Sequence, residues 1–318
     1  IVEKHVPRSP LDALKRAALR TVLPRPALFR PLLKMGQTMR PLLPAALKRK
    51  VPEAQTRTLD WPVPRHQRRM LVLDGCVQPA LAPDINPATA RVLDRLGIAL
   101  VKDDAAGCCG AVTFHLNRQD DGRNYMRRNI DAWWPHVEAG VEAVVITASG
   151  CGTLVKEYGH HLAQDPIYAQ KAATISSLTR DIAEIVYAER DKLQELLTPA
   201  ILPSASAASV ARARLAFHSP CTLQHGLKIR GMVEAILLSA DFELTAVPDS
   251  HLCCGSAGTY SILEPELSQR LLKNKVAALE SDAPSAIATA NIGCLTHIQS
   301  GSRLSVRHWI NILDERLS

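Results

Sequence analysis

Two pairs of adjacent cysteines, Cys108-Cys109 and Cys253-Cys254, are the residues of this chain best suited to chemistry, and a glycine follows each pair. The geometry of a disulfide makes a bond between neighbouring cysteines difficult. Both thiols can instead face one metal centre, while the glycine lets the backbone turn tightly around it. Reduced thiols also suit a chain of this size, which does not need disulfides to fold. We therefore predict a metal or redox site at each pair.

The eight cysteines form two groups of four with nearly the same spacing. Counterparts in the two groups are Cys76 and Cys221, Cys108 and Cys253, Cys109 and Cys254, and Cys151 and Cys294. The first three pairs of counterparts are 145 residues apart, and the fourth pair is 143 residues apart. Cysteines scattered for packing would not keep this register, so the sequence indicates one metal or redox unit that occurs twice.

Four thiolates suit either a zinc ion or an iron–sulfur cluster. Structural zinc is usually held by Cys-x-x-Cys pairs, and the sequence contains none. Adjacent cysteines point apart on an extended backbone and suit a larger group, in which separate irons each take one thiolate. The cysteine pattern therefore favours an iron–sulfur cluster over zinc.

The elements that must position these thiols follow an α/β pattern, repeated once. We expect strands at 70–73, 98–101 and 143–147, and again at 215–218, 244–247 and 286–290. We expect helices at 87–96, 123–139 and 177–197, then at 223–239 and 265–280, with a last short strand and helix within 305–317. Each cysteine position follows the end of a strand, and the carboxyl edge of a parallel sheet is where ligand sites form.

The predicted fold is thus α/β, with two pseudo-symmetric repeats of a small parallel-sheet domain behind a helical amino-terminal arm. We divide the chain into a basic arm and linker (1–67), a first cysteine-rich domain (68–197), a connector (198–210) and a second cysteine-rich domain (211–318). A chain of 318 residues is long enough for two domains, each with its own core. No apolar run approaches the roughly 18 residues of a membrane-spanning helix.

The arm carries the basic charge of the chain. Residues 1–70 hold 16 Lys/Arg and 4 Asp/Glu, whereas the remainder holds 22 Lys/Arg and 27 Asp/Glu. Residues 9–50 read as short amphipathic helices broken by prolines, namely Pro24, Pro26, Pro31, Pro41 and Pro44. Such an arm either lies on an anionic membrane surface or packs on its own body or on a partner subunit. With aromatic residues at 4% and no nucleic-acid-binding motif, we exclude nucleic acid as a partner.

The pattern Cys, then Cys-Cys-Gly, then Cys, present twice, resembles the cysteine-rich CCG domains of the heterodisulfide reductase B subunit and its relatives. Longer runs resemble the glycolate oxidase iron–sulfur subunits over essentially the whole chain. These runs are Gly-Cys-Val-Gln-Pro (75–79), Ala-Gly-Cys-Cys-Gly-Ala (106–111), Asn-Ile-Asp-Ala-Trp-Trp-Pro (129–135), Thr-Ala-Ser-Gly-Cys-Gly (147–152), Pro-Cys-Thr-Leu-Gln-His (220–225), Pro-Asp-Ser-His-Leu-Cys-Cys-Gly-Ser-Ala-Gly (248–258) and Thr-Ala-Asn-Ile-Gly-Cys (289–294).

The resemblance implies an electron-transfer subunit of a glycolate dehydrogenase complex at the inner, cytoplasmic face of the cytoplasmic membrane. Flavin subunits that carry FAD would oxidise glycolate to glyoxylate, and this chain would pass the electrons toward the respiratory chain. The eight cysteines would bind iron–sulfur clusters of the 4Fe–4S type. The alternative is a scaffold that assembles the flavin subunits, with zinc-filled or empty cysteine sites.

Two departures from the family pattern change these expectations. The sequence lacks the ferredoxin-type Cys-x-x-Cys-x-x-Cys run, so we expect it to be the carboxy-terminal part of the full subunit. The full heterodisulfide reductase pattern ends each unit in Cys-x-x-Cys, but Leu154 and His297 stand at the last of these positions. A five-thiolate cluster therefore lacks one ligand in each unit, and a four-thiolate cluster remains.

Other residues near the cysteines have a functional and a structural interpretation. His297 is either a fifth ligand or a histidine that hydrogen-bonds near the cluster, and His225 and His251 are candidates to hydrogen-bond cluster sulfurs. The glycines after the cysteine pairs, Gly110 and Gly255, are expected to let the backbone approach the cluster. Solvated or structural roles are expected for His115 and Lys156. Trp133 and Trp134 either mark a subunit interface or lie, one or both, in the core.

No flavin, nicotinamide or Ser/His/Asp constellation stands out from the sequence. We therefore assign no catalytic residue to this chain and expect substrate oxidation on a partner flavin subunit.

Overall fold

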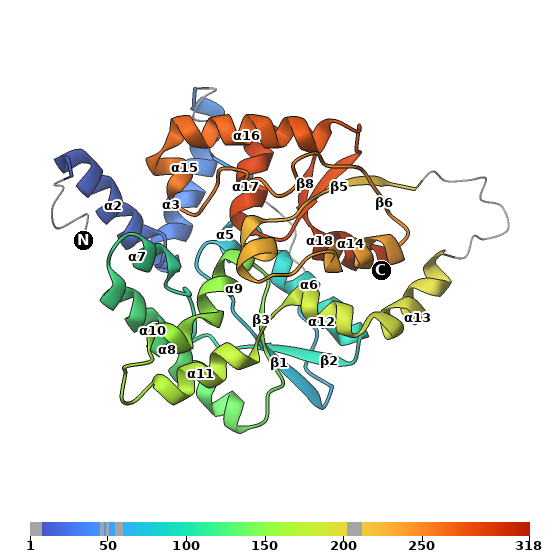
Figure 1. Cartoon of the computed structure of the whole chain (residues 1–318), viewed down its shortest axis with the longest axis horizontal. Coiled ribbons are helices and arrows are strands. Elements are labelled where there is room, and N and C mark those ends of the chain that lie inside the picture. The colour runs from blue at the N-terminus through green and yellow to red at the C-terminus, as the bar shows by residue number, and fades with distance from the viewer. Residues whose placement is uncertain (1–7, 45–47, 49–50, 55–59, 202–211) are drawn as a thin grey trace.

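Two four-stranded parallel sheets form the centre of the computed structural model, which describes residues 8–44, 48, 51–54, 60–201 and 212–318 (Figure 1). The first sheet has the order β2 (Ile98–Lys102), β1 (Arg68–Val72), β3 (Val144–Ile146), β4 (Thr179–Asp181). The second sheet has the order β6 (Glu243–Leu244), β5 (Arg214–His218), β7 (Ala286–Thr289), β8 (Val306–His308). All neighbouring strands are parallel, and the same strand order in both sheets confirms the predicted α/β repeat.

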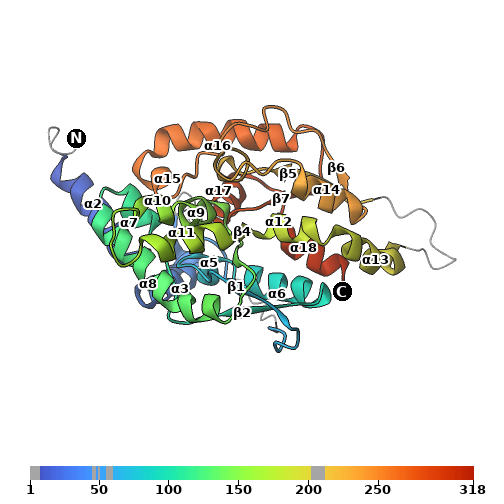
Figure 2. The same cartoon turned by 60° about the horizontal axis from the view of Figure 1, so that its bottom comes forward.

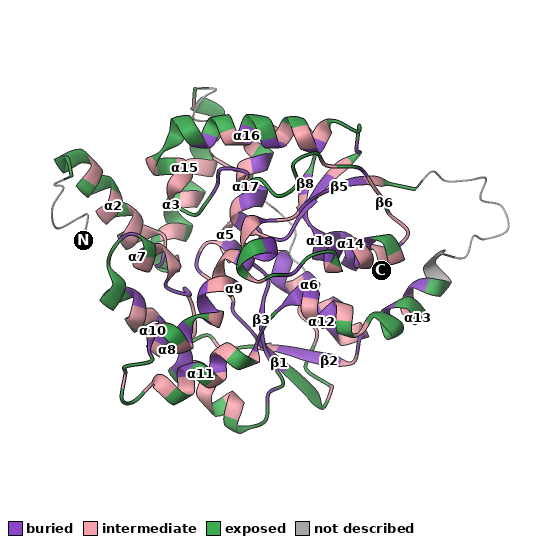
Figure 3. Cartoon of the chain, in the orientation of Figure 1, coloured by how far each residue is buried: buried purple, intermediate pink, exposed green. Residues whose placement is uncertain are grey.

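Helical connections cover both faces of each sheet, as parallel strands require. In the first unit these helices are α5 (Gln78–Leu81), α6 (Ile85–Arg95), α7 (Ala111–His115), α8 (Gln119–Glu138), α9 (Ser149–Lys156), α10 (Tyr158–His161), α11 (Ala169–Leu178), α12 (Ile182–Ala188) and α13 (Arg190–Ile201). In the second unit they are a π-helical turn, η2 (Thr222–Gly226), and α14 (Met232–Ser239), α15 (Tyr260–Leu263), α16 (Pro265–Glu280), α17 (Ile292–Gly301) and α18 (Trp309–Arg316). The inner strands β3, β5 and β7 are accordingly buried almost throughout, whereas β6 and the start of β1 are not, as Figure 3 shows.

Two predicted helices are wrong in part, because tertiary contacts override the local pattern. The stretch 177–197 contains the strand β4, which pairs with β3 before α12 begins. Asp181 then caps α12 in a capping box with Glu184. The stretch 223–239 is a π-helical turn followed by α14, because Lys228 and Gly231 both take positive φ and interrupt the helix. Most of the predicted connector at 198–210 lies outside the described residues.

The arm forms α2 (Pro10–Val22), α3 (Pro26–Met39) and the short 3₁₀ turn η1 (Arg40–Leu42). Pro31 lies inside α3, so the prediction that it breaks the helix is wrong; it is exposed, and water can bond the one carbonyl that it leaves unpaired. Neither α2 nor α3 buries any residue completely. The arm nevertheless touches the body, because the Arg20 guanidinium donates to the carbonyl of Leu116 at 3.1 Å.

Helices from the carboxy-terminal part of each unit pack on the other unit. In Figures 1 and 2, α18 of the second unit packs on α6 of the first, and α12 of the first packs on α14 of the second. Arg91 on α6 forms an ion pair with Asp314 on α18, and the Asn311 side chain donates to Asp84 at 2.5 Å. One hydrophobic cluster consequently runs through both units, whereas separate cores were expected; a second cluster lies within the first unit alone.

This packing is anchored where β8 enters α18. The His308 ring accepts a hydrogen bond from the Ile310 amide at Nδ1, 3.3 Å, so its protonated Nε2 donates to the carbonyl of Thr147 at 2.9 Å. Burial lowers the pKa of His308 to about 4, which keeps the ring neutral at physiological pH. The carboxyl end of the first unit's β3 is thereby held against the second unit.

No helix in the described part of the chain is long and apolar enough to cross a membrane.

The shared core predicts that damage in one unit destabilises both. Trp309 is completely buried at the start of α18, in the cluster that spans the units. We expect Trp309→Ala to lower the free energy of unfolding by about 3–5 kcal/mol and to reduce amide protection in β1 as well as β5. Urea unfolding and hydrogen exchange measured by mass spectrometry check this. Leu238→Ala, at a residue that is 56% exposed, is the control, and protection of β1 that survives Trp309→Ala would contradict the shared core.

Candidate metal centre

The first four thiols gather at the carboxyl ends of three neighbouring strands. Cys76 follows β1, the Cys108-Cys109 pair follows β2, and Cys151 lies in the first turn of α9, directly after β3. All four are free thiols; Cys151 is half-buried and the other three are buried. A helix amino terminus favours a thiolate, so the position of Cys151 suits a metal ligand.

These four thiols act on one another as a continuous chain of contacts. The Cys108 thiol raises the pKa of Cys76, and hydrogen bonds from Cys109 and then Cys76 hold the pKa of Cys108 well below its usual range. Cys108 and then Cys151 raise the pKa of Cys109. Cys108 is therefore the thiol that most readily loses its proton, and a metal that binds the group must displace the remaining protons.

The second unit repeats the arrangement with Cys221 before η2, the pair Cys253-Cys254 after β6, and Cys294 in the first turn of α17. Hydrogen bonds from Cys221 and then Cys254 lower the pKa of Cys253 to about 2. Cys254 and Cys294 are buried, but Cys221 and Cys253 are half-buried. The thiols therefore contact one another in the same sequence in both units. The partly solvent-exposed thiols differ, because they are Cys151 in the first unit and Cys221 and Cys253 in the second.

The glycine after each pair is required by the backbone and by a helix. Gly110 has φ +96° and Gly255 has φ +89°, which L side chains rarely adopt. A Cβ atom would lie 2.9 Å from the carbonyl oxygen of Gly122 at Gly110, and 2.6 Å from that of Ser268 at Gly255. The amides of these glycines donate to sulfur, Gly110 to Cys108 at 3.4 Å and Gly255 to Cys253 at 3.3 Å. Their expected approach to a cluster stays a prediction.

Buried polar side chains hold the first loop, and the sequence analysis did not identify them as such. Asn129 accepts from the Gly107 amide and donates to the Cys108 carbonyl, both at 3.0 Å. The Tyr158 hydroxyl donates to the Cys109 carbonyl at 2.7 Å. The sequence did contain a signal for this role of Asn129, which lies in the middle of the long helix α8. A helix interior favours Asn only when its side chain has hydrogen-bond partners.

In the second unit, Ser268 and Lys275 on α16 hold the loop. The Ser268 hydroxyl donates to the Gly255 carbonyl at 2.8 Å, and its oxygen lies 3.1 Å from Nε2 of His297. Lys275 is 2% exposed and donates to the carbonyl of Asp249 at 2.9 Å. His297 is thus half-buried and engaged with Ser268, and burial lowers its pKa.

The other predicted histidines lie at the surface. His225 and His251 are both exposed, and Nε2 of His225 lies 3.3 Å from the carbonyl oxygen of His251. Trp133 is buried as expected, whereas the Trp134 indole donates to Glu138 on the surface. Lys156 forms an ion pair with Glu184, which fits the structural role expected for it.

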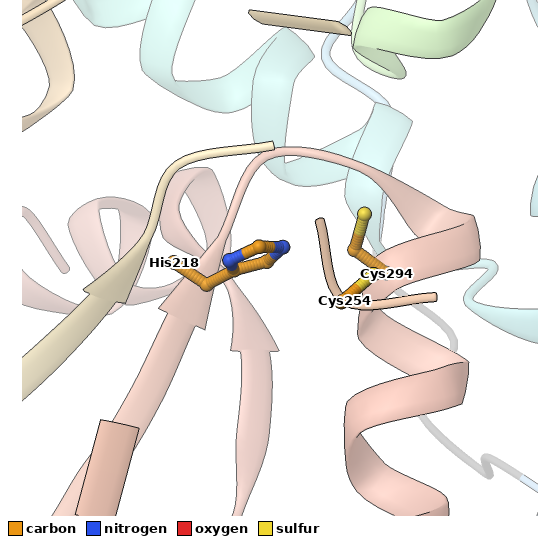
Figure 4. Close-up of side chains that lie close together, drawn as sticks. All are labelled: His218, Cys254 and Cys294. Carbon is orange, nitrogen blue, oxygen red and sulfur yellow. The ribbon is translucent and has the colours of Figure 1, made fainter. Parts of the chain in front are cut away.

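The sequence analysis missed His218, the last residue of β5. Its imidazole is buried and lies with the sulfurs of Cys254 and Cys294 in one group, whose ligand atoms are all within 4.8 Å of one another. Figure 4 shows the ring pointing from the end of the strand toward both cysteines. The signal in the sequence was a histidine at a strand end, three residues before Cys221.

One side chain connects the two thiol groups. Asn291 on the β7–α17 loop accepts a hydrogen bond from the amide of Gly150, the neighbour of Cys151, at 3.3 Å. Its amide group donates to the sulfur of Cys294 at 3.4 Å. The hydroxyls of Ser149 and Thr222, next to the thiol groups of the two units, are 2.7 Å apart. The two candidate centres therefore face each other across the junction between the units.

The residues present fit a thiolate-bound metal group. Each centre offers four sulfur donors, and the second adds a buried imidazole that makes no hydrogen bond of good geometry with the described residues. Soft thiolate and imidazole donors select zinc or iron–sulfur clusters over magnesium or calcium.

The close helix contact at Gly255 predicts a graded effect of alanine substitutions. Gly258→Ala introduces only the strain of a positive φ, because nothing lies within 4 Å of the added Cβ, and should cost about 1–2 kcal/mol of unfolding free energy. Gly255→Ala adds the collision with the Ser268 carbonyl. It should therefore lower the free energy of unfolding by more than Gly258→Ala does, and it should also lower the metal content. Urea unfolding and elemental analysis under anaerobic conditions measure both. Equal losses for the two variants would remove the helix contact as the reason for this glycine.

Comparison with known proteins agrees with this geometry. The cysteine-rich CCG domain family matches residues 70–156 and 215–299, which contain all eight cysteines. These ranges fall within the predicted domains 68–197 and 211–318, whose ends stay predictions.

Three relatives match most of this chain. The glycolate oxidase iron–sulfur subunit of Escherichia coli (strain K12) is 50% identical over 317 residues, which is 100% of this chain and 75% of that protein. The probable glycolate oxidase iron–sulfur subunit of Bacillus subtilis (strain 168) is 30% identical over 295 residues, 90% of this chain and 62% of that protein. Lactate utilization protein A of Bacillus velezensis is 26% identical over 249 residues, 76% of this chain and 97% of that protein. This chain therefore belongs to the family of CCG cysteine-rich proteins that includes the glycolate oxidase iron–sulfur subunits.

Proposed function

We propose that this chain is the iron–sulfur electron-transfer subunit of a glycolate dehydrogenase complex. The observation that carries the proposal is the pair of four-thiol groups, each a continuous set of contacts at the carboxyl edge of a parallel sheet. The names of the E. coli and B. subtilis relatives support glycolate as the substrate of the complex. The oxidation itself is assigned to a partner flavin subunit that carries FAD.

Eight thiols would hold the two metal groups. The first would be bound by Cys76, Cys108, Cys109 and Cys151, and the second by Cys221, Cys253, Cys254 and Cys294. An iron–sulfur cluster of the 4Fe–4S type supplies one-electron uptake and release. The four-thiol count of each unit supports this cluster type.

Hydrogen-bond donors and cations near both four-thiol groups stabilise the negative charge of the thiolates. The amides of Gly110 and Gly255 donate to one sulfur in each group, which favours the thiolate. The Arg128 guanidinium donates to the Cys108 carbonyl and favours the thiolate of Cys108, and the buried ammonium of Lys275 lies at the second group. These cations offset part of the charge that four thiolates would bring into a buried site.

The junction between the units gives electrons a short covalent and hydrogen-bonded route. Asn291 connects the backbone beside Cys151 with the sulfur of Cys294 through hydrogen bonds of 3.3 and 3.4 Å. This route supports a relay through both centres, from the flavin subunit toward an acceptor in the respiratory chain.

Iron and acid-labile sulfide analysis tests the proposal. After anaerobic purification and reconstitution, we expect iron and sulfide in the chain, and a loss of about half of the iron in either Cys109→Ser or Cys254→Ser, since each variant removes a ligand from one centre. Exposed His251→Ala is the control and should keep the full content. A chain that takes up no iron, and holds zinc or free thiols instead, would support the scaffold alternative and exclude electron transfer.

We further propose that the arm docks on the cytoplasmic face of the membrane. Exposed cations, namely Lys15, Arg30 and Lys34, lie on the same two helices as exposed apolar side chains, including Leu14, Leu32 and Met35. Basic and apolar side chains on one helical surface suit an anionic lipid headgroup layer. The contact of Arg20 with the body supports an arm that is held in place without being buried.

Vesicle sedimentation measures this docking. We expect the double variant Arg30→Glu/Lys34→Glu to bind phosphatidylglycerol-containing vesicles at least several-fold more weakly than the unaltered chain, because each cation contributes about 1 kcal/mol near an anionic surface. The control, Arg180→Glu/Arg190→Glu, changes the same net charge at exposed positions outside the arm. Equal losses in both variants would point to net charge alone and remove the arm as the docking element.

A further inference from the structure

His218 is the one buried imidazole of the second centre, and its position is set by β5. The strand pairs with β7 up to its last residue, which places His218 at the carboxyl edge of the sheet, where the thiols gather. The residue is 1% exposed. Its ring points toward Cys254 and Cys294, and the ligand atoms of these three residues are within 4.8 Å of one another (Figure 4).

Neither ring nitrogen of His218 makes a hydrogen bond of good geometry with the residues that the structure describes, although the imidazole, after Cys254, helps to hold the pKa of the Cys294 thiol below its usual range. The other fully buried histidine of this unit, His308, has both nitrogens engaged. Thr289 lies opposite His218 on β7, and its buried hydroxyl also has no hydrogen-bond partner among the described residues. The side chains of this cross-strand pair therefore do not hydrogen-bond to each other. A buried imidazole without a hydrogen bond of good geometry is costly, and a bound group absent from the polypeptide would remove that cost.

The first centre has no counterpart of this imidazole. The residue 145 positions before His218 is Leu73, which is buried and apolar. His297 also replaces a leucine of the first unit, Leu154, but its Nε2 contacts the Ser268 hydroxyl, and it is not a member of the group formed by His218 and the two thiols. The geometry therefore selects His218 over His297, although the sequence had made His297 the candidate for a fifth ligand.

We propose that His218 is a nitrogen ligand of the metal group in the second centre, in addition to the four cysteines, and that the two centres are therefore inequivalent. This inference rests on the proposed iron–sulfur function. Histidine nitrogen is a known ligand of iron in iron–sulfur centres, and a donor added to one centre alone makes the ligand sets of the two centres different.

Isotope labelling tests the ligand directly. The reconstituted full chain is prepared with ¹⁵N-labelled and with unlabelled histidine, and pulsed EPR is recorded on the reduced protein. We expect the strong hyperfine coupling of a directly bound nitrogen, its loss in His218→Leu, which copies Leu73 of the first unit, and its retention in His297→Leu, the matched control. A redox titration should show a shifted potential for one centre in His218→Leu and no change in the other. If His218→Leu does not fold, His218→Gln gives the same readouts.

The possible outcomes separate this inference from the proposed function. A chain that takes up iron and sulfide in both centres but shows no strong nitrogen coupling, or keeps it in His218→Leu, overturns His218 as a ligand and leaves the iron–sulfur function intact. Loss of the coupling in His297→Leu alone assigns the ligand to His297 and overturns the inference in the same way. A chain without iron overturns the proposed function, and the inference falls with it.

Discussion

The tight turn after each cysteine pair is the constraint on which the rest of the structure depends. At Gly110 and Gly255 the backbone is left-handed and lies against the carbonyl oxygens of a long helix, so no side chain can be accommodated. This contact turns the two thiols of each pair toward the carboxyl edge of the sheet, where the cysteines from the neighbouring strand ends already lie. It also aims the glycine amide at the first sulfur of the pair. The same turn therefore sets both the position of the thiols and the hydrogen bond that favours one of them as a thiolate.

The packing of helices from each unit on the other explains why two small repeats can hold two centres in fixed relation. Because α18 packs on α6 and α12 on α14, neither unit completes its core alone. A small α/β unit buries only part of the surface that its chain exposes, and the shared core compensates for this. The same packing brings Gly150 to Asn291, so the junction that stabilises the fold also connects the centres.

The two units keep the positions of their thiols and differ in the residues around them. Leu73 and Leu154 of the first unit correspond to His218 and His297 of the second. The loop of the first pair is held by a neutral amide and a phenol, at Asn129 and Tyr158, whereas the second is held by a hydroxyl and an ammonium. Polar and charged groups near a metal centre tune its potential, so a repeat with the same four thiols can still support two different centres.

The sequence by itself determined the grouping of the eight cysteines, the repeat and the α/β class, because these depend on spacing along the chain and on local apolar patterns. The strand ends beside the cysteines were predictable for the same reason: a buried parallel strand is a short apolar run. Only the tertiary structure decided that residues 179–181 form an edge strand, since their pairing with β3 is not visible locally. The packing of helices from each unit on the other was likewise set by contacts in space. His218 is the clearest case, because a histidine at a strand end is an ordinary residue until the fold brings the sulfurs of Cys254 and Cys294 to it.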